Sequence, residues 1–425
     1  MSIQPFAHPP DGPVVVVGGG IVGLSCAWSL RRAGADVIVL EAGARTGGGA
    51  SRGNAGAICP SLVEPLAAPG MVRAALKDLR RSDAALHVHP AYMPQMAGFL
   101  LRFRRSGTQA AYDRGVRALA QLGRGVMAAY DRLADAGIGT HARRDGYLVV
   151  HRDPVAAAEE HARIAGMTAL GVSAEPGPLL DAAALRALEP LLGDAAVAGF
   201  VIPDERWIDA SLLLDDLTVA VIAAGVDLRT DTSVSAIHDL GDVVEVDAAG
   251  GTVSGAVVVV AAGVWTRDLV APLGVKLTMH AGKGYSFALH PARMPERVLS
   301  LSGAHVMASP LGDRLRVAGT MEFDGTTDRF HPERIQAIVR GLAPMLRDVD
   351  LSDRSEEWVG PRPMTPDGLP VLGPIAAHPR VVLATGHNML GVTLGPVTGD
   401  VVAGLVCAGE PGIDLAPFAP ERFRR

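Results

Sequence analysis

Three glycines in a fixed pattern offer the clearest chemistry in this chain. Gly18, Gly20 and Gly23 follow an apolar run of valines and open a helix-like stretch. In such a turn the first glycine permits the tight bend, the second lets the backbone approach a pyrophosphate, and the third lets the helix pack on the strand. A second apolar run ends at Glu41, whose carboxylate can accept hydrogen bonds from a ribose hydroxyl. The pattern predicts a binding site for a dinucleotide.

Apolar runs and cap residues predict the elements that position this turn. Strands are expected at residues 14–17 and 37–40, with a helix to residue 33 between them. Asp209 and Gly225 mark the start and the end of a later helix. Further strands are expected at residues 147–151, 226–228, 234–238, 243–247, 256–262 and 381–384. Helices are expected to dominate residues 92–133 and 154–191, and a loop at 386–395 precedes a last helix at 398–407.

The composition describes a globular protein with a large core. The 425 residues are 48% hydrophobic and 20% charged, with 50 glycines that suit tight turns. A formal net charge of −6 argues against nucleic acid as a partner. Cys26, Cys59 and Cys407 are widely spaced and match neither a disulfide framework nor a set of metal ligands. We therefore expect a protein without a bound metal, in a reducing cytoplasm.

The first residues show no targeting signal. Residues 1–12 are polar and proline-rich, and they lack basic side chains. The apolar stretch at residues 13–30 contains four glycines and is explained by the strand, turn and helix described above. We therefore expect neither a signal peptide nor a membrane span in this part of the chain.

Several further blocks follow the first motif in a fixed order. They are Gly49-Ala50-Ser51, Asn54-Ala55-Gly56, the strand end at residues 260–263, and the segments 282–286, 360–368 and 385–394. Together with residues 18–23 and Glu41, these blocks resemble the FAD-dependent D-amino-acid oxidase and glycine oxidase superfamily, most closely its bacterial D-amino-acid dehydrogenase branch. The resemblance spans nearly the whole chain.

The resemblance implies an α/β fold in two parts. An FAD-binding, Rossmann-like domain of the glutathione-reductase type would comprise residues 1–81, 206–274 and 357–425. An inserted α+β substrate domain, built on a mainly antiparallel sheet, would comprise residues 82–205 and 275–356. The cofactor domain is therefore expected to be discontinuous in sequence.

The resemblance also implies FAD, held without a covalent bond. Related sarcosine oxidases attach the flavin through a cysteine near the position of Gly360, where this chain has none. The residues expected to contact FAD are Gly18, Gly20, Ile21, Val22, Gly23, Glu41, Ala42, Gly49, Ala50, Ser51, Asn54, Ala55, Gly56, Val234, Ala262, Gly263, Trp265, Arg362, Gly391, Val392, Thr393 and Leu394. For Asn54 the alternative is an Asx turn that stabilises its own loop.

In similar enzymes a hydride passes from the amine-bearing carbon to the flavin, and the remaining imine hydrolyses. Because the flavin carries the reaction, the protein needs few acid–base residues. Arg362 stands where similar enzymes place the guanidinium that holds the substrate carboxylate, and a structural salt bridge is the alternative. Tyr285 would help to bind the same carboxylate, or would be a core or rim tyrosine. His387 would be a general base, or a structural histidine held by a hydrogen bond.

The segment at residues 391–394 resembles the helix N-terminus that faces the reduced flavin in this superfamily. Backbone N–H groups there would stabilise the negative charge that develops on the flavin. Just before it, the chain has Asn388, Met389 and Leu390 where some relatives carry an arginine. This departure favours an apolar pocket for the substrate side chain.

The resemblance predicts oxidation of a D-amino acid or of a cyclic secondary amine such as a D-proline derivative, with O₂ or a quinone as electron acceptor. A glycine or sarcosine oxidase acting on N-alkyl glycines is the alternative. A dinucleotide-binding subunit without catalysis is the alternative of a different class. The amphipathic segment at residues 92–105 ends in basic residues, and contact with the inner face of a membrane would suit transfer to the respiratory chain. Ordinary packing of that helix is the favoured interpretation.

Overall fold

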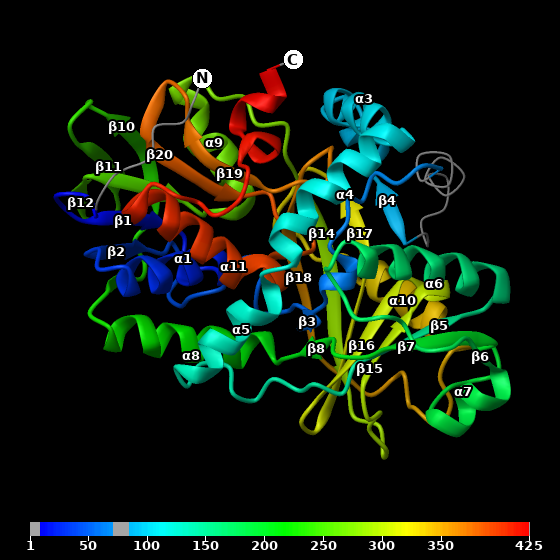
Figure 1. Cartoon of the computed structure of the whole chain (residues 1–425). Coiled ribbons are helices and arrows are strands. Elements are labelled where there is room, and N and C mark those ends of the chain that lie inside the picture. Colours follow the sequence, from blue (N-terminus) through cyan, green and yellow to red (C-terminus); the bar gives the residue numbers. More distant parts are fainter. Residues whose placement is uncertain (1–8, 71–84, 425) are drawn as a thin grey trace.

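The computed structural model describes residues 9–70 and 85–424. Within these ranges the strands form a six-stranded and a nine-stranded sheet that lie beside each other (Figure 1). Most of the polar N-terminal segment, and residue 81, at which the first predicted domain segment ends, lie outside the described residues.

The six-stranded sheet is built around β1, which pairs in parallel with a strand on each side. The order across the sheet is β19 (Val371–Ile375), β20 (His378–Thr385), β13 (Val257–Val260), β1 (Val14–Val17), β2 (Val37–Leu40) and β9 (Asp227–Arg229). β19 is antiparallel to its neighbour at the edge, and the other pairs are parallel. The apolar runs that predicted strands near residues 14, 37, 257 and 381 are confirmed in this sheet.

Both faces of this sheet are covered, which explains why the central strands β1, β2 and β13 are unbroken apolar runs. The four valines of β1 are at most 3% exposed. Helices cover one face, and a three-stranded antiparallel sheet covers the other. The helices are α1 (Ile21–Arg32), α4 (Gln109–Gly123), α5 (Val126–Asp135), α8 (Ala210–Ala223) and α11 (Gly391–Ala403). The three strands are β10 (Val234–Asp239), β11 (Val244–Ala248) and β12 (Gly251–Gly255).

β12 was not predicted from the sequence. Its residues read Gly-Thr-Val-Ser-Gly, and Val253 is the single large apolar side chain among them. Glycines weaken a strand in isolation. β12 is stabilised by its antiparallel pairing with β11, and its own sequence lacks the alternating apolar pattern of a strand.

The nine-stranded sheet is mainly antiparallel, as predicted. Its order is β18 (Arg354–Met364), β14 (His280–Leu289), β17 (Arg314–Phe323), β16 (Val306–Leu311), β15 (Val298–Leu301), β5 (Tyr147–His151), β7 (Ala198–Ile202) and β6 (Leu180–Asp181), with β4 (Leu86–Val88) beside β17. The pairs β15–β5 and β17–β4 are parallel. β18 crosses residue 357, at which one predicted domain boundary lies, and the domain boundaries stay a prediction.

Helices also cover the nine-stranded sheet. α10 (Pro332–Leu342) packs on one face through Ile335, Ile338 and Leu342. On the other face lie α3 (Ala97–Ser106) and α6 (Pro154–Ala169). The remaining short elements are α7 (Ala182–Leu188), α9 (Thr266–Val270), and the two-stranded pair β3 (Ala57–Ile58) and β8 (Arg206–Trp207). α3 begins at Ala97, whereas helical structure was predicted from residue 92.

The last helix, α11, begins earlier than predicted. It begins at Gly391 and not at residue 398, so the loop before it is shorter than expected. Pro396 lies inside the helix, where its missing N–H leaves the carbonyl of Val392 without its helical partner. The hydroxyl of the buried Tyr130 donates a hydrogen bond of 2.6 Å to that carbonyl. A distant side chain therefore makes the proline compatible with a helix.

Gly399 allows α11 to lie against α1. A Cβ at this position would be 2.4 Å from the carbonyl oxygen of Ser25. In the described part of the chain, residues 391–408 form the one helical stretch that is long and apolar enough to cross a membrane. Because 78% of that stretch is buried inside the protein, it is accounted for as a core helix.

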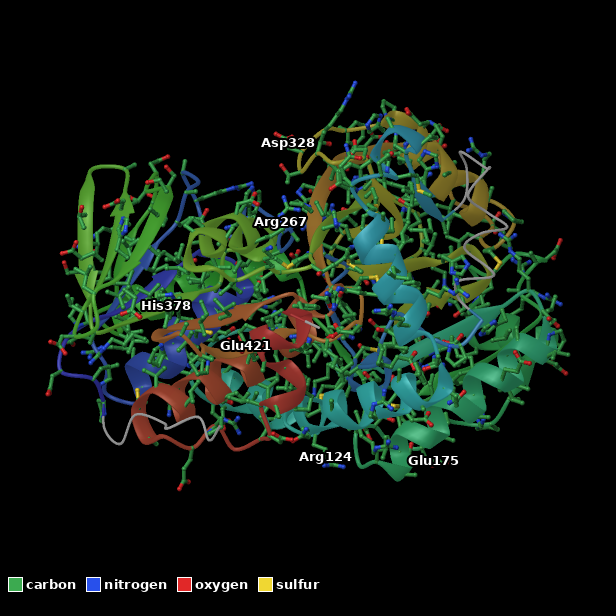
Figure 2. All side chains as sticks on the ribbon, turned by 90° about the horizontal axis from the view of Figure 1, so that it is seen from above. Arg124, Glu175, Arg267, Asp328, His378 and Glu421 are labelled. Carbon is green, nitrogen blue, oxygen red and sulfur yellow. The ribbon has the colours of Figure 1, made fainter. Side chains whose placement is uncertain are left out.

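Charged side chains of both signs are spread over the protein. Figure 2 shows Arg124 and Glu175 at the same edge, which therefore carries both signs of charge.

Candidate active site

A cavity of about 730 Å³ opens where the strands of the six-stranded sheet end. It is lined by residues that follow β1, β2, β13 and β20, and by residues of β18 from the nine-stranded sheet. Ligands of open α/β sheets bind outside the carboxyl ends of the strands. The cavity is therefore placed to hold a ligand that reaches from one sheet to the other.

The glycine-rich turn forms the middle of the cavity. Gly18 has a φ of +105°, and a Cβ there would lie 2.7 Å from the carbonyl oxygen of Ala261. A Cβ on Gly23 would lie 1.9 Å from the carbonyl oxygen of Gly18, so only glycine lets α1 lie this close to the turn. Gly20, Ile21 and Val22 line the cavity at the N-terminus of α1, where a pyrophosphate is stabilised. Gly23 itself does not line the cavity; its role is in packing.

Glu41 lies at one end of the cavity. Its carboxylate accepts hydrogen bonds from the backbone N–H of Gly19 at 2.6 Å and from that of Gly43 at 2.8 Å. Each carboxylate oxygen has a second lone pair, so the group can still accept the hydroxyls of a ribose. Ala42 and Val234 line the same end.

The polar neighbours of Val234 were not predicted as site residues. Thr232, Ser233 and Ser235 also line the cavity, as does Asp268 on α9. A run of hydroxyl side chains on both sides of an apolar residue was the available signal. These groups can form hydrogen bonds with the end of the ligand that lies near Glu41.

The glycine-rich segment at residues 47–56 lines the next part of the cavity through Gly49, Ala50, Ser51 and Asn54. The Oγ of Ser51 accepts a hydrogen bond of 3.2 Å from the N–H of Ile21 and so caps α1. The Oδ1 of Asn54 accepts one of 2.8 Å from the N–H of Gly56. This is the Asx turn that was the alternative for Asn54, although its side chain also lines the cavity.

Ala55 and Gly56 do not line the cavity, although they were predicted to contact the cofactor. Gly56 has a φ of +76°, and a Cβ there would lie 1.8 Å from the carbonyl oxygen of Ile208. Its role in the structure is therefore close backbone packing. By contrast Ala262, Gly263 and Trp265, after β13, line the cavity.

The N-terminus of α11 closes the other end of the cavity. Gly391 and Val392 line it, and the first N–H groups of a helix have no acceptor within the helix. Thr393 and Leu394 do not line it. The hydroxyl of Thr393 donates a hydrogen bond of 2.9 Å to the carbonyl oxygen of Ala57, and Leu394 is in the core. The helix therefore presents backbone donors to the cavity, which suits a ligand carrying negative charge.

Arg362 on β18 lines the cavity at this same end. Its Nη1 donates a hydrogen bond of 2.8 Å to the backbone carbonyl of Thr320. Burial lowers the pKa of Arg362 to about 10, so the guanidinium stays charged at pH 7. Among residues 9–70 and 85–424, no carboxylate forms a salt bridge with Arg362. Because a structural salt bridge was the alternative, its absence there favours a carboxylate from a ligand.

The structure separates Tyr285 from the cavity. Its ring is fully buried in the core beneath α10, 5.7 Å from the ring of Phe330. Its hydroxyl donates a hydrogen bond of 2.5 Å to Glu322. Arg362 lies over Gly284, the next residue along β14, and successive side chains of a strand point to opposite faces. Tyr285 is therefore a core tyrosine, and its expected contact with the substrate carboxylate is wrong.

His387 lines the cavity but is only 2% exposed. Its Nε2 is 3.0 Å from the hydroxyl of Thr398 on α11. Burial lowers the pKa of His387 to about 4, so the imidazole is neutral at pH 7. These contacts support the interpretation of His387 as a structural histidine held by a hydrogen bond.

Acid should destabilise the protein through His387. Its pKa is about 4 in the folded chain and 6.5 without burial, so the unfolded chain binds more protons between these values. Folding stability should therefore fall as the pH drops from 6.5 to 4, by up to about 3 kcal/mol from this residue. Unfolding free energy measured against pH should fall less steeply in His387→Gln. Parallel curves for the two proteins would contradict the assignment.

Asn388 shapes the loop between β20 and α11. It has a φ of +53°, and its Oδ1 accepts a hydrogen bond of 2.8 Å from the N–H of Thr365. Its amide nitrogen donates to the carbonyl of Gly386 at 2.9 Å. The side chain is thus used within the protein, while Met389 lines the cavity and is 45% exposed. This end of the cavity is more apolar than it would be with an arginine there.

The chain is similar to a family of flavoenzymes. Residues 13–405 match the DAO family, described as FAD dependent oxidoreductase. A protein named D-amino acid dehydrogenase from Methylobacterium sp. (strain 4-46) is 33% identical over 423 residues, which cover 97% of this chain and 99% of that one. Another of the same name, from Rhizorhabdus wittichii, is also 33% identical, over 96% of this chain and 100% of its own.

Two solved structures share the architecture. Glycine oxidase from Geobacillus kaustophilus superposes with a TM-score of 0.72 at 24% identity, covering 98% of this chain and 99% of that one. L-proline dehydrogenase from P. horikoshii superposes with a TM-score of 0.74 at 18% identity, with the same coverage of both chains. These likenesses show a common fold.

Proposed function

The chain belongs to the DAO family of FAD-dependent oxidoreductases, and from that premise we propose that it deaminates a D-amino acid by oxidation. One observation carries the proposal: Arg362, whose half-buried guanidinium has no carboxylate partner among the described residues, faces the same cavity as a glycine-rich dinucleotide turn. The relatives named D-amino acid dehydrogenase support the substrate class.

The residues of the cavity suit FAD. Glu41 and Val234 would hold its adenosine end, and the N-terminus of α1 would hold its pyrophosphate. Gly49 and Trp265 would lie beside the ring system. None of the cysteines lines the described cavity, which favours non-covalent binding. The bound flavin supplies the acceptor for the hydride that leaves the substrate.

The residues of this chain would bind and orient the amino acid. Arg362 would hold the carboxylate through two parallel hydrogen bonds, because a guanidinium matches a carboxylate in shape. The held substrate loses a hydride from Cα and a proton from its amine, and the resulting imine takes up water to give a 2-oxo acid and ammonia. The N–H groups at the start of α11 would stabilise the negative charge left in the cavity. Met389 and Trp265 would contact the substrate side chain.

A glycine- or sarcosine-type oxidation is the second candidate. It is favoured by the fold that the chain shares with glycine oxidase from Geobacillus kaustophilus. A cyclic D-proline-type substrate fits the first candidate, because the apolar end near Met389 would accept a ring. A binding subunit without catalysis is less well supported, since it gives no reason for the position of Arg362.

Anaerobic reduction of the flavin tests the proposal. The purified holoprotein should lose its flavin absorbance when mixed with a D-amino acid and should keep it with the L enantiomer. Loss of absorbance with sarcosine or glycine, and not with D-amino acids, would support the second candidate. Retention of absorbance with every amine would contradict both.

The electron acceptor belongs to the proposal as well. We expect the reduced protein to pass electrons to O₂ or to a quinone of the respiratory chain, and we expect it in the cytoplasm or on the inner face of the membrane. Reoxidation by a soluble quinone under anaerobic conditions, compared with reoxidation by O₂, separates the two acceptors.

A further inference from the structure

The guanidinium of Arg362 contacts the backbone of two neighbouring strands, β14 and β17. A Cβ on Gly284 would lie 2.1 Å from the guanidinium carbon, so the guanidinium rests directly on β14. At its side, Nη1 donates to the carbonyl oxygen of Thr320 at 2.8 Å. The direction of one carbonyl group on β17 therefore helps to set where the guanidinium points.

Thr320 lies in a strained part of β17. Its φ is +54°, a value that β-branched residues rarely adopt. Across from it, β14 pairs Lys283 with Glu322 and Tyr285 with Gly319, so two residues of β17 face the single Gly284. This is a β-bulge, a feature that turns backbone and side chains in a new direction. The Oγ1 of Thr320 is buried and has no hydrogen-bond partner among the described residues, so these contacts of the side chain do not explain the conformation.

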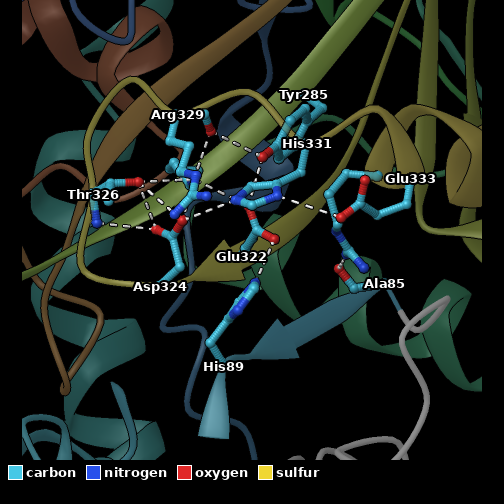
Figure 3. A network of polar contacts seen from close by, with 11 residues as sticks. Ala85, His89, Tyr285, Glu322, Asp324, Thr326, Arg329, His331 and Glu333 are labelled. Carbon is cyan, nitrogen blue, oxygen red and sulfur yellow. Dashed lines mark hydrogen bonds and ion pairs between the residues drawn. The ribbon is translucent and has the colours of Figure 1, made fainter. Parts of the chain in front are cut away.

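A buried cluster on the opposite face of the sheet clamps the bulge (Figure 3). Lys283 and Tyr285, on either side of Gly284, both bind Glu322. The Lys283 Nζ is 3.1 Å from Oε2 of Glu322, and the Tyr285 hydroxyl donates to the same oxygen at 2.5 Å. The side chains of Lys283 and Glu322 are 0% and 1% exposed. The two residues of β14 that flank Gly284 are thus tied to the residue of β17 that ends the bulge.

Other contacts complete the cluster. Lys283 also donates to Asp324 and to the carbonyl oxygen of Arg329, both at 2.7 Å. His89 lies 3.0 Å from Glu322, and His331 lies 3.2 Å from Asp324. Although burial alone would raise it, hydrogen bonds from Tyr285 and His89 and the charge of Lys283 lower the pKa of Glu322.

The same two histidines and two carboxylates lie close enough together to hold a metal ion. However, the ammonium group of Lys283 already donates to both carboxylates. The protein therefore supplies the positive charge itself, and the cluster is better explained as a structural clamp than as a metal site.

We propose that the clamp of Lys283, Tyr285 and Glu322 and the strained Thr320 are positioning residues for Arg362. They fix the bulge, the bulge directs the Thr320 carbonyl, and the carbonyl orients the guanidinium for a substrate carboxylate. This inference rests on the proposed role of Arg362. It assigns to Tyr285 an indirect effect on carboxylate binding through Glu322, from the far side of the sheet.

Carboxylate binding by folded variants tests the proposal. The probe is propionate, which has no amine to oxidise, and its Kd is read from the change in the flavin spectrum of the holoprotein. Tyr285→Phe removes one hydroxyl and keeps the buried ring, and Glu322→Gln removes the charge and keeps the size. Both should bind propionate at least about 10-fold more weakly, which is the lower end of what the loss of an outer-shell partner costs at metal sites. The KM for the amino acid should rise more than kcat falls.

One matched control and one variant of the bulge separate positioning from stability. Glu160→Gln removes a half-buried carboxylate of α6 that binds Arg163 on the same helix and His151 on β5. The Kd of this variant for propionate should stay within about 2-fold of wild type. At Thr320 itself, proline locks φ near −65° in place of the observed +54°, so Thr320→Pro should bind propionate weakly. A purely structural role would lower the melting temperature and leave the Kd unchanged.

The outcomes distinguish this inference from the proposed function. If Tyr285→Phe and Glu322→Gln bind propionate as the wild type does while Arg362→Ala does not, the clamp has no positioning role and the anchor stands. If the wild type shows no binding, or Arg362→Ala binds equally well, the proposed function of Arg362 fails instead.

Discussion

Arg362→Ala should lose most of its activity toward amino acids. The variant removes the guanidinium that lines the cavity and that no carboxylate neutralises in the described part of the chain. Removing one partner of a buried charge pair costs about 2–5 kcal/mol, so kcat/KM should fall by about 30- to 5,000-fold. Steady-state kinetics with a D-amino acid measures this directly, and the rise in KM shows how much of the loss lies in binding.

Arg362→Lys is the matched variant. It keeps the positive charge but lacks the planar fork that holds a carboxylate through two hydrogen bonds. We expect an intermediate activity, with the hydrogen bond to Thr320 lost or altered. If kcat/KM barely changes in Arg362→Ala, the carboxylate is held elsewhere and the assignment is wrong.

Gly23→Ala should fail to retain FAD. The added Cβ would lie 1.9 Å from the carbonyl oxygen of Gly18, so α1 must move away from the turn. That movement displaces the N–H groups expected to hold the pyrophosphate. Overpacking of this kind costs about 1–3 kcal/mol of stability. The ratio of flavin to protein absorbance after purification, and the melting temperature, measure the two effects.

Gly166→Ala is the control for this variant. Gly166 lies in α6, away from the cavity, and a Cβ there meets no heavy atom within 4 Å. Alanine in a helix interior is favoured over glycine by about 0.5–1 kcal/mol, so this variant should bind FAD normally and be at least as stable. Normal flavin content in Gly23→Ala would show that α1 need not approach the turn so closely.

The first part of the site could be predicted from sequence because its signals are local. β1, the turn, α1, β2 and Glu41 follow one another within 28 residues, from Val14 to Glu41. The spacing of the glycines and of Glu41 along the chain was enough to predict the turn. The glycine-rich segment and Arg362 could be predicted through the resemblance of several blocks, which agrees with the family match over residues 13–405.

The remaining features depend on contacts between distant segments. The start of α11 was misplaced because Pro396 is compatible with a helix only where Tyr130 satisfies the carbonyl of Val392. The face of Tyr285 was misjudged because it depends on the register of β14 against β17 and β18. The position of Thr320 beside Arg362 follows from a bulge, which leaves no mark in the sequence of either strand.

In the proposed reaction, this cavity brings FAD and an amino acid held by Arg362 together so that the hydrogen on Cα can be transferred. Anaerobic stopped-flow absorbance of the holoprotein, mixed with a D-amino acid and with the same compound deuterated at Cα, measures this transfer. We predict that the flavin absorbance decays at a rate that saturates with substrate concentration and that deuterium slows. Flavin that stays oxidised with the D-amino acid at every concentration would contradict the proposed reaction.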